Sequence, residues 1–150
     1  ILVNPLAWML TVNIAQSVYG VNYLFNGNNE MGLSSENDVT AVSAYLNAHT
    51  NANNLVLASA QILWAIPNFR QTDWGITAAV NNQSGLMERT LYDCSLPAVR
   101  FAVVDSLALG FVRNLDPAMK EIVDQVQLWP LVFKSGDLNV HQNPVELYIQ

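Results

Sequence analysis

The sequence predicts an all-α fold, a single bundle of six or seven helices followed by an extended C-terminal tail. Two observations carry this prediction. Apolar residues recur at helical spacing along several stretches of the chain, and helix-start signals, in which a capping residue precedes proline or acidic residues, divide it into segments. The length of 150 residues suits one domain, residues 1–150, with one hydrophobic core.

Start and stop signals place the helices of the first half. An Asn-Pro pair begins a helix over residues 4–25. Ser35, with two acidic residues just after it, caps a second helix that runs to about residue 48. The mostly apolar stretch 55–66 predicts a third helix, which Pro67 ends because the residue before a proline avoids helical geometry.

The second half repeats this pattern. Residues 73–81 and 85–92 predict two short helices, and 97–113 predicts the strongest element. That stretch is apolar nearly all round, which is typical of a buried helix. A cap-plus-proline signal then begins a helix over residues 116–128. Beyond it, glycine, asparagine and proline make helix unfavourable, so residues 131–150 are expected to be extended.

The composition indicates assembly with other copies of the chain. Charged residues make up 12% of the sequence, about half the usual fraction, and such a surface keeps a free monomer poorly soluble. The segments 1–6 and 131–150 are expected to serve as arms between subunits. A net charge of −6 argues against a conventional nucleic-acid binder, although it allows one arginine per copy to meet nucleic acid in a long array.

The sequence offers little for catalysis, cofactors or membrane insertion. His49 and His141 lie far apart without further ligands in metal-binding spacing, and Cys94 has no partner base. Glycine-rich phosphate loops and nucleophile elbows are absent from the sequence. The uncharged stretch 1–25 is interrupted by polar residues and lacks the features of a signal peptide. We therefore expect no enzyme, no cofactor, no metal and no membrane contact, with an enzyme of unrecognised type left as a third alternative.

Asp105 requires a partner, because burying an isolated carboxylate is costly. Arg100 is five positions away, about 140° round a helix, so the two side chains do not meet easily. Arg70 is the preferred partner. Such a pair has two interpretations, a structural ion pair between helices or a cleft that holds an external anion.

Three segments, taken in order, resemble a known family. They are Phe69-Arg70-Gln71, Leu91-Tyr92-Asp93-Cys94-Ser95-Leu96 and Arg100-Phe101-Ala102-Val103-Val104-Asp105. Together they are similar to the core of the coat proteins of flexuous filamentous plant viruses of the potyvirus and potexvirus type. The resemblance implies an all-helical coat subunit in which a serine, an arginine and an aspartate converge on the genomic RNA. The matching positions are Ser35 or Ser34, Arg70 and Asp105, with Arg100 as a further RNA-binding candidate.

These observations predict a self-assembling structural subunit, a viral coat protein that packages single-stranded RNA without sequence preference in a helical filament. Its expected partners are other copies of itself and single-stranded RNA, and its expected location is the virion. The alternative is a soluble helical module that binds an apolar ligand or a partner helix in a groove lined by methionines and by Trp8, Trp64 and Trp74.

Overall fold

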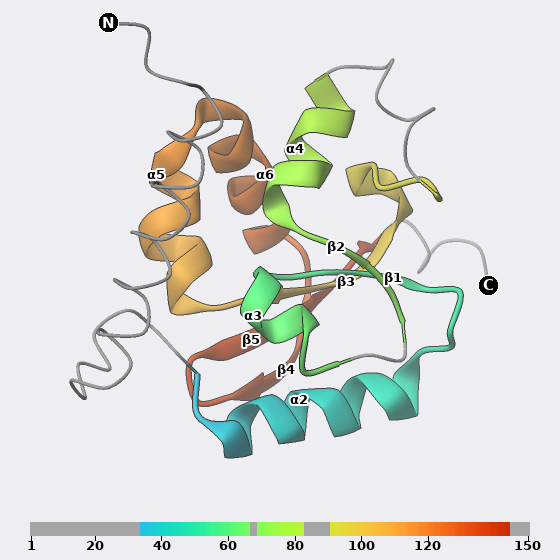
Figure 1. The fold of residues 1–150 in the computed structure, drawn as a ribbon. Coiled ribbons are helices and arrows are strands. Elements are labelled where there is room, and N and C mark those ends of the chain that lie inside the picture. Colours follow the sequence, from blue (N-terminus) through green and yellow to red (C-terminus); the bar gives the residue numbers. More distant parts are fainter. Residues whose placement is uncertain (1–33, 67–68, 83–90, 145–150) are drawn as a thin grey trace, which may run out of the picture. The chain divides into compact units, whose positions relative to one another are not determined.

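The computed structural model describes residues 34–66, 69–82 and 91–144, which belong to one compact unit, Gly32–Gln150. This unit is not all-α, so the predicted helical bundle is wrong. Its centre is a five-stranded mixed sheet with helices on both faces (Figure 1). The strands are β1 (Leu55–Leu57), β2 (Arg70–Thr72), β3 (Val99–Val104), β4 (Leu131–Ser135) and β5 (Leu138–Gln142).

The sheet has the order β2-β1-β3-β5-β4. The first three strands are parallel, with Leu55 aligned to Arg70 on one side and to Val99 on the other. The last two form an antiparallel hairpin whose strand β5 pairs with β3. The chain therefore goes from β1 out to one neighbour, β2, and returns to the other neighbour, β3, which is the crossover pattern of a doubly wound sheet.

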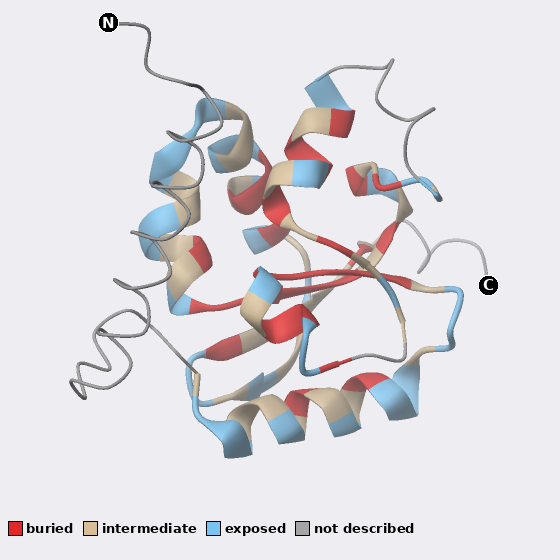
Figure 2. Cartoon of the chain, viewed as in Figure 1, coloured by how far each residue is buried: buried red, intermediate tan, exposed pale blue. Residues whose placement is uncertain are grey.

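Two hydrophobic layers hold the helices on the sheet. On one face lie α2 (Glu36–His49) and α3 (Ala60–Leu63). On the other face lie α4 (Trp74–Asn82), the π-helical turn η4 (Ala108–Val112), α5 (Arg113–Leu115) and α6 (Pro117–Gln127). The short 3-10 turn η3 (Leu96–Ala98) comes directly before β3. Buried residues concentrate on the central strands and on the helix sides that face them (Figure 2).

The two predicted helices over 55–66 and 97–113 are wrong for the same reason. Each contains a buried strand, β1 or β3, and the α- or π-helical part comes only after that strand. All three residues of β1 and five of the six residues of β3 are buried. A parallel strand covered on both faces is a continuous apolar run, and periodicity alone does not distinguish such a run from a buried helix.

Three helix starts are confirmed, because the capping side chains make the expected hydrogen bonds. Ser35 accepts from the backbone N–H of Asp38 at the start of α2, and Asp116 accepts from that of Ala118 at the start of α6. Asp73 does the same for Ile76 at the start of α4. The predicted helix 4–25 lies outside the described residues, as does the predicted helix 85–92 except for residues 91 and 92, which are not helical.

The C-terminal segment is part of the sheet as far as residue 142. Residues 131–142, expected to belong to an extended arm between subunits, form the β4–β5 hairpin, in which β5 pairs with β3 of the same chain. Gly136 lies in the two-residue turn between these strands and has φ +54°. No other described residue has a positive φ. This matches a hairpin turn with glycine at its first central position.

Candidate functional site

The best-defined polar site lies at the edge of the sheet where the parallel strands end. Asp105 directly follows β3, and Ser59 and Gln61 follow β1. From these points the chain leaves toward opposite faces, into α3 after β1 and into η4 after β3. In doubly wound sheets this is the point at which ligands bind.

The Asp105 carboxylate is fully buried and accepts three hydrogen bonds there. Ser59 Oγ donates to Oδ1 at 2.9 Å, Gln61 Nε2 to Oδ2 at 3.2 Å and the backbone N–H of Ala108 to Oδ1 at 2.7 Å. Burial raises the pKa of Asp105, and the hydrogen bonds from Ala108, Ser59 and Gln61 partly oppose that rise. The donors are neutral, so the expected pairing with a cation is not what satisfies this carboxylate.

In this arrangement the Asp105 side chain occupies the position where a ligand would bind. The N–H of Ala108 and the hydroxyl of Ser59 are donors of the type that an anionic ligand requires at the start of a helix. Asp105 occupies both of them with its own carboxylate. We therefore interpret the cluster as a bridge that fixes the loop after β1 to the loop after β3.

The raised pKa predicts a specific pH dependence of stability. In the folded state the pKa of Asp105 is higher than its ordinary value of 3.8, so the folded protein keeps this proton at pH values where the unfolded chain loses it. The stabilisation from this group is therefore complete below pH 3.8 and is lost as the pH rises through the folded-state pKa. In Asp105→Asn this dependence disappears. The difference in unfolding free energy, wild type minus Asp105→Asn, is expected to be largest in acid and to fall as the pH rises, as measured by urea denaturation at a series of pH values.

Asp38 provides a control of opposite sign. Hydrogen bonds from Ser135 and Ser35 lower the pKa of its carboxyl, so its stabilisation is present above pH 3.8 and is lost as the pH falls. The corresponding difference for Asp38→Asn should therefore rise with pH. Two differences with the same slope would contradict the environments described for these carboxylates.

Arg70 and Arg100 lie where the parallel strands begin, whereas Asp105 lies where they end. Arg70 is the first residue of β2 and is aligned through Leu55 with Val99, six residues before Asp105. At about 3.3 Å per residue the two levels are about 20 Å apart along the strands. The structure therefore does not bring Arg70 and Asp105 together, and the convergence that the coat-protein resemblance implies is absent.

Both arginines contact neighbours at their own edge. The exposed Arg70 donates to Asn53 Oδ1 at 3.4 Å, and its guanidinium lies 5.6 Å from the ring centre of Tyr92. Arg100 is half-buried at an irregularity in the pairing of β1 with β3, with its guanidinium 5.6 Å from the ring centre of Phe101. Their predicted role in RNA binding stays a prediction.

The two serines lie at the start of α2, close to the hairpin turn. Ser35 caps α2 and donates to the carboxylate of Asp38, which also accepts from Ser135. The buried Ser34 hydroxyl has no hydrogen-bond partner among the described residues. Because Ser106 in turn donates to Asp137 of the same turn, Ser35 lies toward the Asp105 edge of the sheet and away from Arg70.

The described tryptophans do not form the groove of the alternative prediction. Trp74, the first residue of α4, is 2% exposed in the core that α4 shares with α6, and its Nε1–H has no acceptor among the described residues. Trp64 is 89% exposed at the end of α3, on the other face of the sheet. Trp8 lies outside the described residues.

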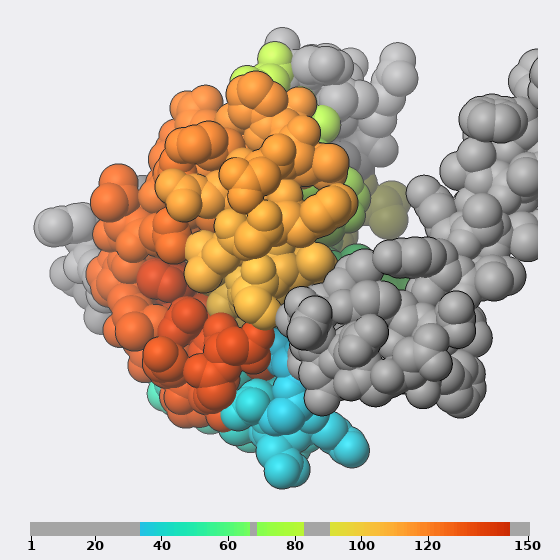
Figure 3. Space-filling model, turned by 90° about the vertical axis from the view of Figure 1, so that its left-hand side faces the viewer, coloured from blue at the N-terminus to red at the C-terminus, as the bar shows by residue number. Residues whose placement is uncertain are grey.

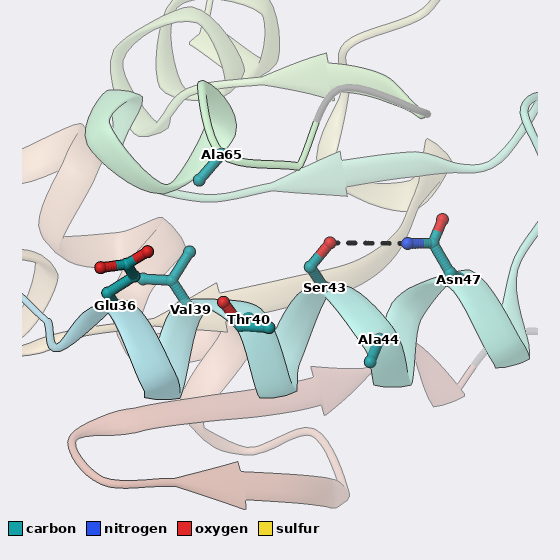
Figure 4. A pocket seen from close by; sticks show the side chains of 7 residues that line it. All are labelled: Glu36, Val39, Thr40, Ser43, Ala44, Asn47 and Ala65. Atoms are coloured by element: carbon teal, nitrogen blue, oxygen red, sulfur yellow. Dashed lines mark hydrogen bonds between the residues drawn. The ribbon is translucent and has the colours of Figure 1, made fainter.

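A groove on the α2 side was not predicted from the sequence. It has a volume of about 580 Å³, within the range of ~300–1,000 Å³ that is typical of binding clefts. Figure 4 shows Ala65, from the turn after α3, facing the side of α2 that carries Val39 and Ser43. The residues that line it are mostly small: Glu36, Val39, Thr40, Ser43, Ala44, Asn47 and Ala65. On α2 these residues recur at intervals of three and four, so they lie on one side of the helix. A helical projection of residues 36–47 would have shown this mostly small side of the helix from the sequence.

Two kinds of feature are absent from the described residues, a candidate metal centre and a membrane-spanning helix. Ranges 34–66, 69–82 and 91–144 contain no group of three or more His, Cys, Asp or Glu side chains placed to hold a metal ion. Within the same ranges, none of the helices has both the length and the apolar character needed to cross a bilayer.

Comparison with known proteins does not place the chain in a family. No family model, curated protein or solved structure matches it. The resemblance to flexuous-virus coat proteins therefore receives no support from these comparisons, and the all-helical fold that it implies is wrong for the described residues.

Proposed function

We propose that the chain is a structural subunit that associates with copies of itself from head to tail, through an apolar helix edge on one face and the α2 groove on the other. The observation that carries this proposal is a set of large apolar side chains left exposed on a charge-poor surface. Among the described residues these are Trp64, Ile76, Leu91, Phe111, Leu115, Leu128 and Leu131.

The helix edge is formed by Phe111 and Leu115, each 58% exposed. They are four residues apart in the helical stretch 106–115, so their side chains lie on one side of it. Figure 3 shows α5 and α6 on one face of the molecule together with the β4–β5 hairpin. Pairs of apolar anchors at this spacing are how an amphipathic helix enters a groove.

The α2 groove has room for part of such a helix. Its small side chains, Thr40, Ser43, Ala44 and Ala65, allow the backbone of a partner helix to approach closely. Trp64, next to Ala65 in the chain, adds exposed apolar surface beside it. The groove therefore offers both space and an apolar contact.

The two surfaces lie on opposite faces of the sheet. The groove belongs to the α2–α3 layer, whereas the helix edge belongs to the layer of α4, α5 and α6. One copy can therefore use both at once, and a contact between two different surfaces propagates into a ring or a filament. This proposal does not depend on RNA, because the predicted convergence of Arg70 and Asp105 is not found: the two residues lie at opposite ends of the parallel strands.

Blocking the groove tests the proposal. Ser43→Trp is expected to reduce association, because the indole fills the space that a neighbouring helix would occupy. In sedimentation velocity over a concentration series, the wild type should show species larger than the monomer, and Ser43→Trp should remain monomeric. Leu91→Ser is the matched control: it removes a fully exposed leucine outside both surfaces and should associate like the wild type. A wild-type chain that stays monomeric at the highest concentration would contradict the proposal.

A further inference from the structure

A second, smaller pocket lies at the edge of the sheet where the parallel strands begin. Its volume is about 230 Å³, or roughly eight water volumes at ~30 Å³ each. It lies between the C-terminal ends of α4 and α6, the start of β3 and the end of β5. The residues that line it are Asn81, Leu96, Pro97, Gln125, Trp129, Asn143 and Pro144, none of them charged.

Hydrogen bonds orient two amides on its rim so that their oxygens remain as acceptors. Asn81 Nδ2 donates to the carbonyl oxygen of Thr77 at 2.7 Å, and Gln125 Nε2 donates to Glu121 Oε1 at 3.1 Å. Each amide nitrogen is thus engaged within its own helix. One hydrogen of each amide nitrogen is used in this way. The amide oxygens have no hydrogen-bond donor among the described residues, and they can accept hydrogen bonds but cannot donate them.

The walls of the pocket are fixed from within. Asn143 is 3% exposed, and its Nδ2 donates to the carbonyl oxygen of Val99 at 2.8 Å and to those of Leu96 and Pro97 at 3.4 Å. This side chain ties the end of β5 to the turn before β3. The space beside it is therefore held by buried hydrogen bonds, as a preformed ligand pocket requires.

The electrostatics of the pocket favour a positive ligand. Helix C-termini carry a partial negative charge of about half an elementary charge, and α4 and α6 both end here, at Asn82 and Gln127. The carboxylate of Glu121, outside the lining, accepts the hydrogen bond of the lining residue Gln125. Trp129 contributes an indole, the aromatic ring with the strongest attraction for cations.

We infer that this pocket binds a small organic cation, a quaternary ammonium group that packs against Trp129 beneath the oxygens of Asn81 and Gln125. Aromatic rings recognise such groups through their negative faces. A quaternary ammonium has no hydrogen to donate, so its positive methyl groups would contact the oxygens electrostatically. The inference is independent of the assembly proposed above.

The test compares choline with 3,3-dimethyl-1-butanol, its neutral analogue of the same shape, by NMR titration of the full chain. Choline should shift the resonances of the pocket residues and bind at least tenfold more tightly than the neutral analogue. Methyl glucoside serves as an uncharged polyol probe. Equal affinity for choline and the neutral alcohol, tighter binding of the glucoside, or the absence of choline binding would each overturn the inference.

Substitutions at the pocket separate charge recognition from simple packing. Trp129→Leu should weaken choline binding about tenfold, whereas Trp64→Leu, at an exposed tryptophan elsewhere, should leave it unchanged. Because Trp129→Leu could also affect folding, the exposed Gln125 provides a second pair of variants: Gln125→Glu should tighten choline binding severalfold, and Gln125→Lys should weaken it by a similar factor. An unchanged affinity in both Gln125 variants would contradict a cation site.

Discussion

Replacing Asp105 by alanine is expected to lower the free energy of unfolding by about 3 kcal/mol, because buried donors lose their acceptor at a cost of ~1–3 kcal/mol each. The N–H of Ala108 and the hydroxyl of Ser59 lose a buried partner, whereas Gln61 is only half-buried and can turn toward water. The substitution also removes a carboxylate whose charged form is destabilised by burial, and this offsets part of the lost free energy of unfolding. Urea denaturation at neutral pH, followed by circular dichroism, measures the difference.

Two variants control this measurement. Asp105→Asn keeps one acceptor oxygen in place and should lose less stability than Asp105→Ala. Ser106, the residue after Asp105, donates an exposed hydrogen bond to Asp137. Ser106→Ala removes this bond and should change the free energy of unfolding by less than about 1 kcal/mol. An Asp105→Ala protein as stable as Ser106→Ala would show that the bridge between the two strand ends does not contribute as described.

Replacing Gly136 by alanine is expected to cost about 2 kcal/mol, the second largest effect. The residue has φ +54°, a conformation that costs a non-glycine residue ~1–2 kcal/mol. A Cβ placed there would also lie 2.3 Å from Asp38 Oδ2, and the carboxylate could move only by giving up hydrogen bonds to Ser35 and Ser135. Thermal unfolding monitored by circular dichroism measures the loss.

The chain supplies its own comparison for this glycine. A Cβ added at the exposed Gly110 meets no atom within 4 Å, so Gly110→Ala should be neutral or stabilising by up to ~1 kcal/mol. In an Asp38→Ala background, Gly136→Ala should cost less than in the wild type, because only the backbone strain remains. Equal losses at Gly136 and Gly110 would refute the conformational argument.

The helices that were predicted correctly are those whose signals are local. Ser35, Asp73 and Asp116 each satisfy a backbone N–H within three residues, and such a pattern can be read from a short window of sequence. These starts correctly located α2, α4 and α6, which supply one wall of the α2 groove and the two helix ends at the smaller pocket.

The strands could not be predicted in the same way. In β3, Phe101 and Val103 face the α2–α3 layer, whereas Ala102 and Val104 face the α4–α6 layer. Every position of β3 except Arg100 is apolar because both faces are covered, so the alternation that marks a half-exposed strand is missing. A run of Val and Phe residues favours a strand over a helix, and this was the signal available in 99–104.

The partner of Asp105 was also beyond prediction from the sequence. A buried carboxylate correctly implied a set of partners, but a helical assignment directed the search to distant cations. Ser59 and Gln61 become neighbours of Asp105 only because β1 and β3 are adjacent and parallel. A pairing between residues more than forty positions apart depends on the order of the strands, which no local pattern in this chain specifies.

Complementation between two defective variants tests the head-to-tail assembly most directly. Phe111→Ser/Leu115→Ser keeps the α2 groove but lacks the helix edge, whereas Ser43→Trp keeps the helix edge but lacks an open groove. Each variant alone is expected to be monomeric. An equimolar mixture in sedimentation velocity should form a dimer and nothing larger, because a single intact interface remains between the two chains. A mixture that stays monomeric, or either variant forming larger species by itself, would contradict the account.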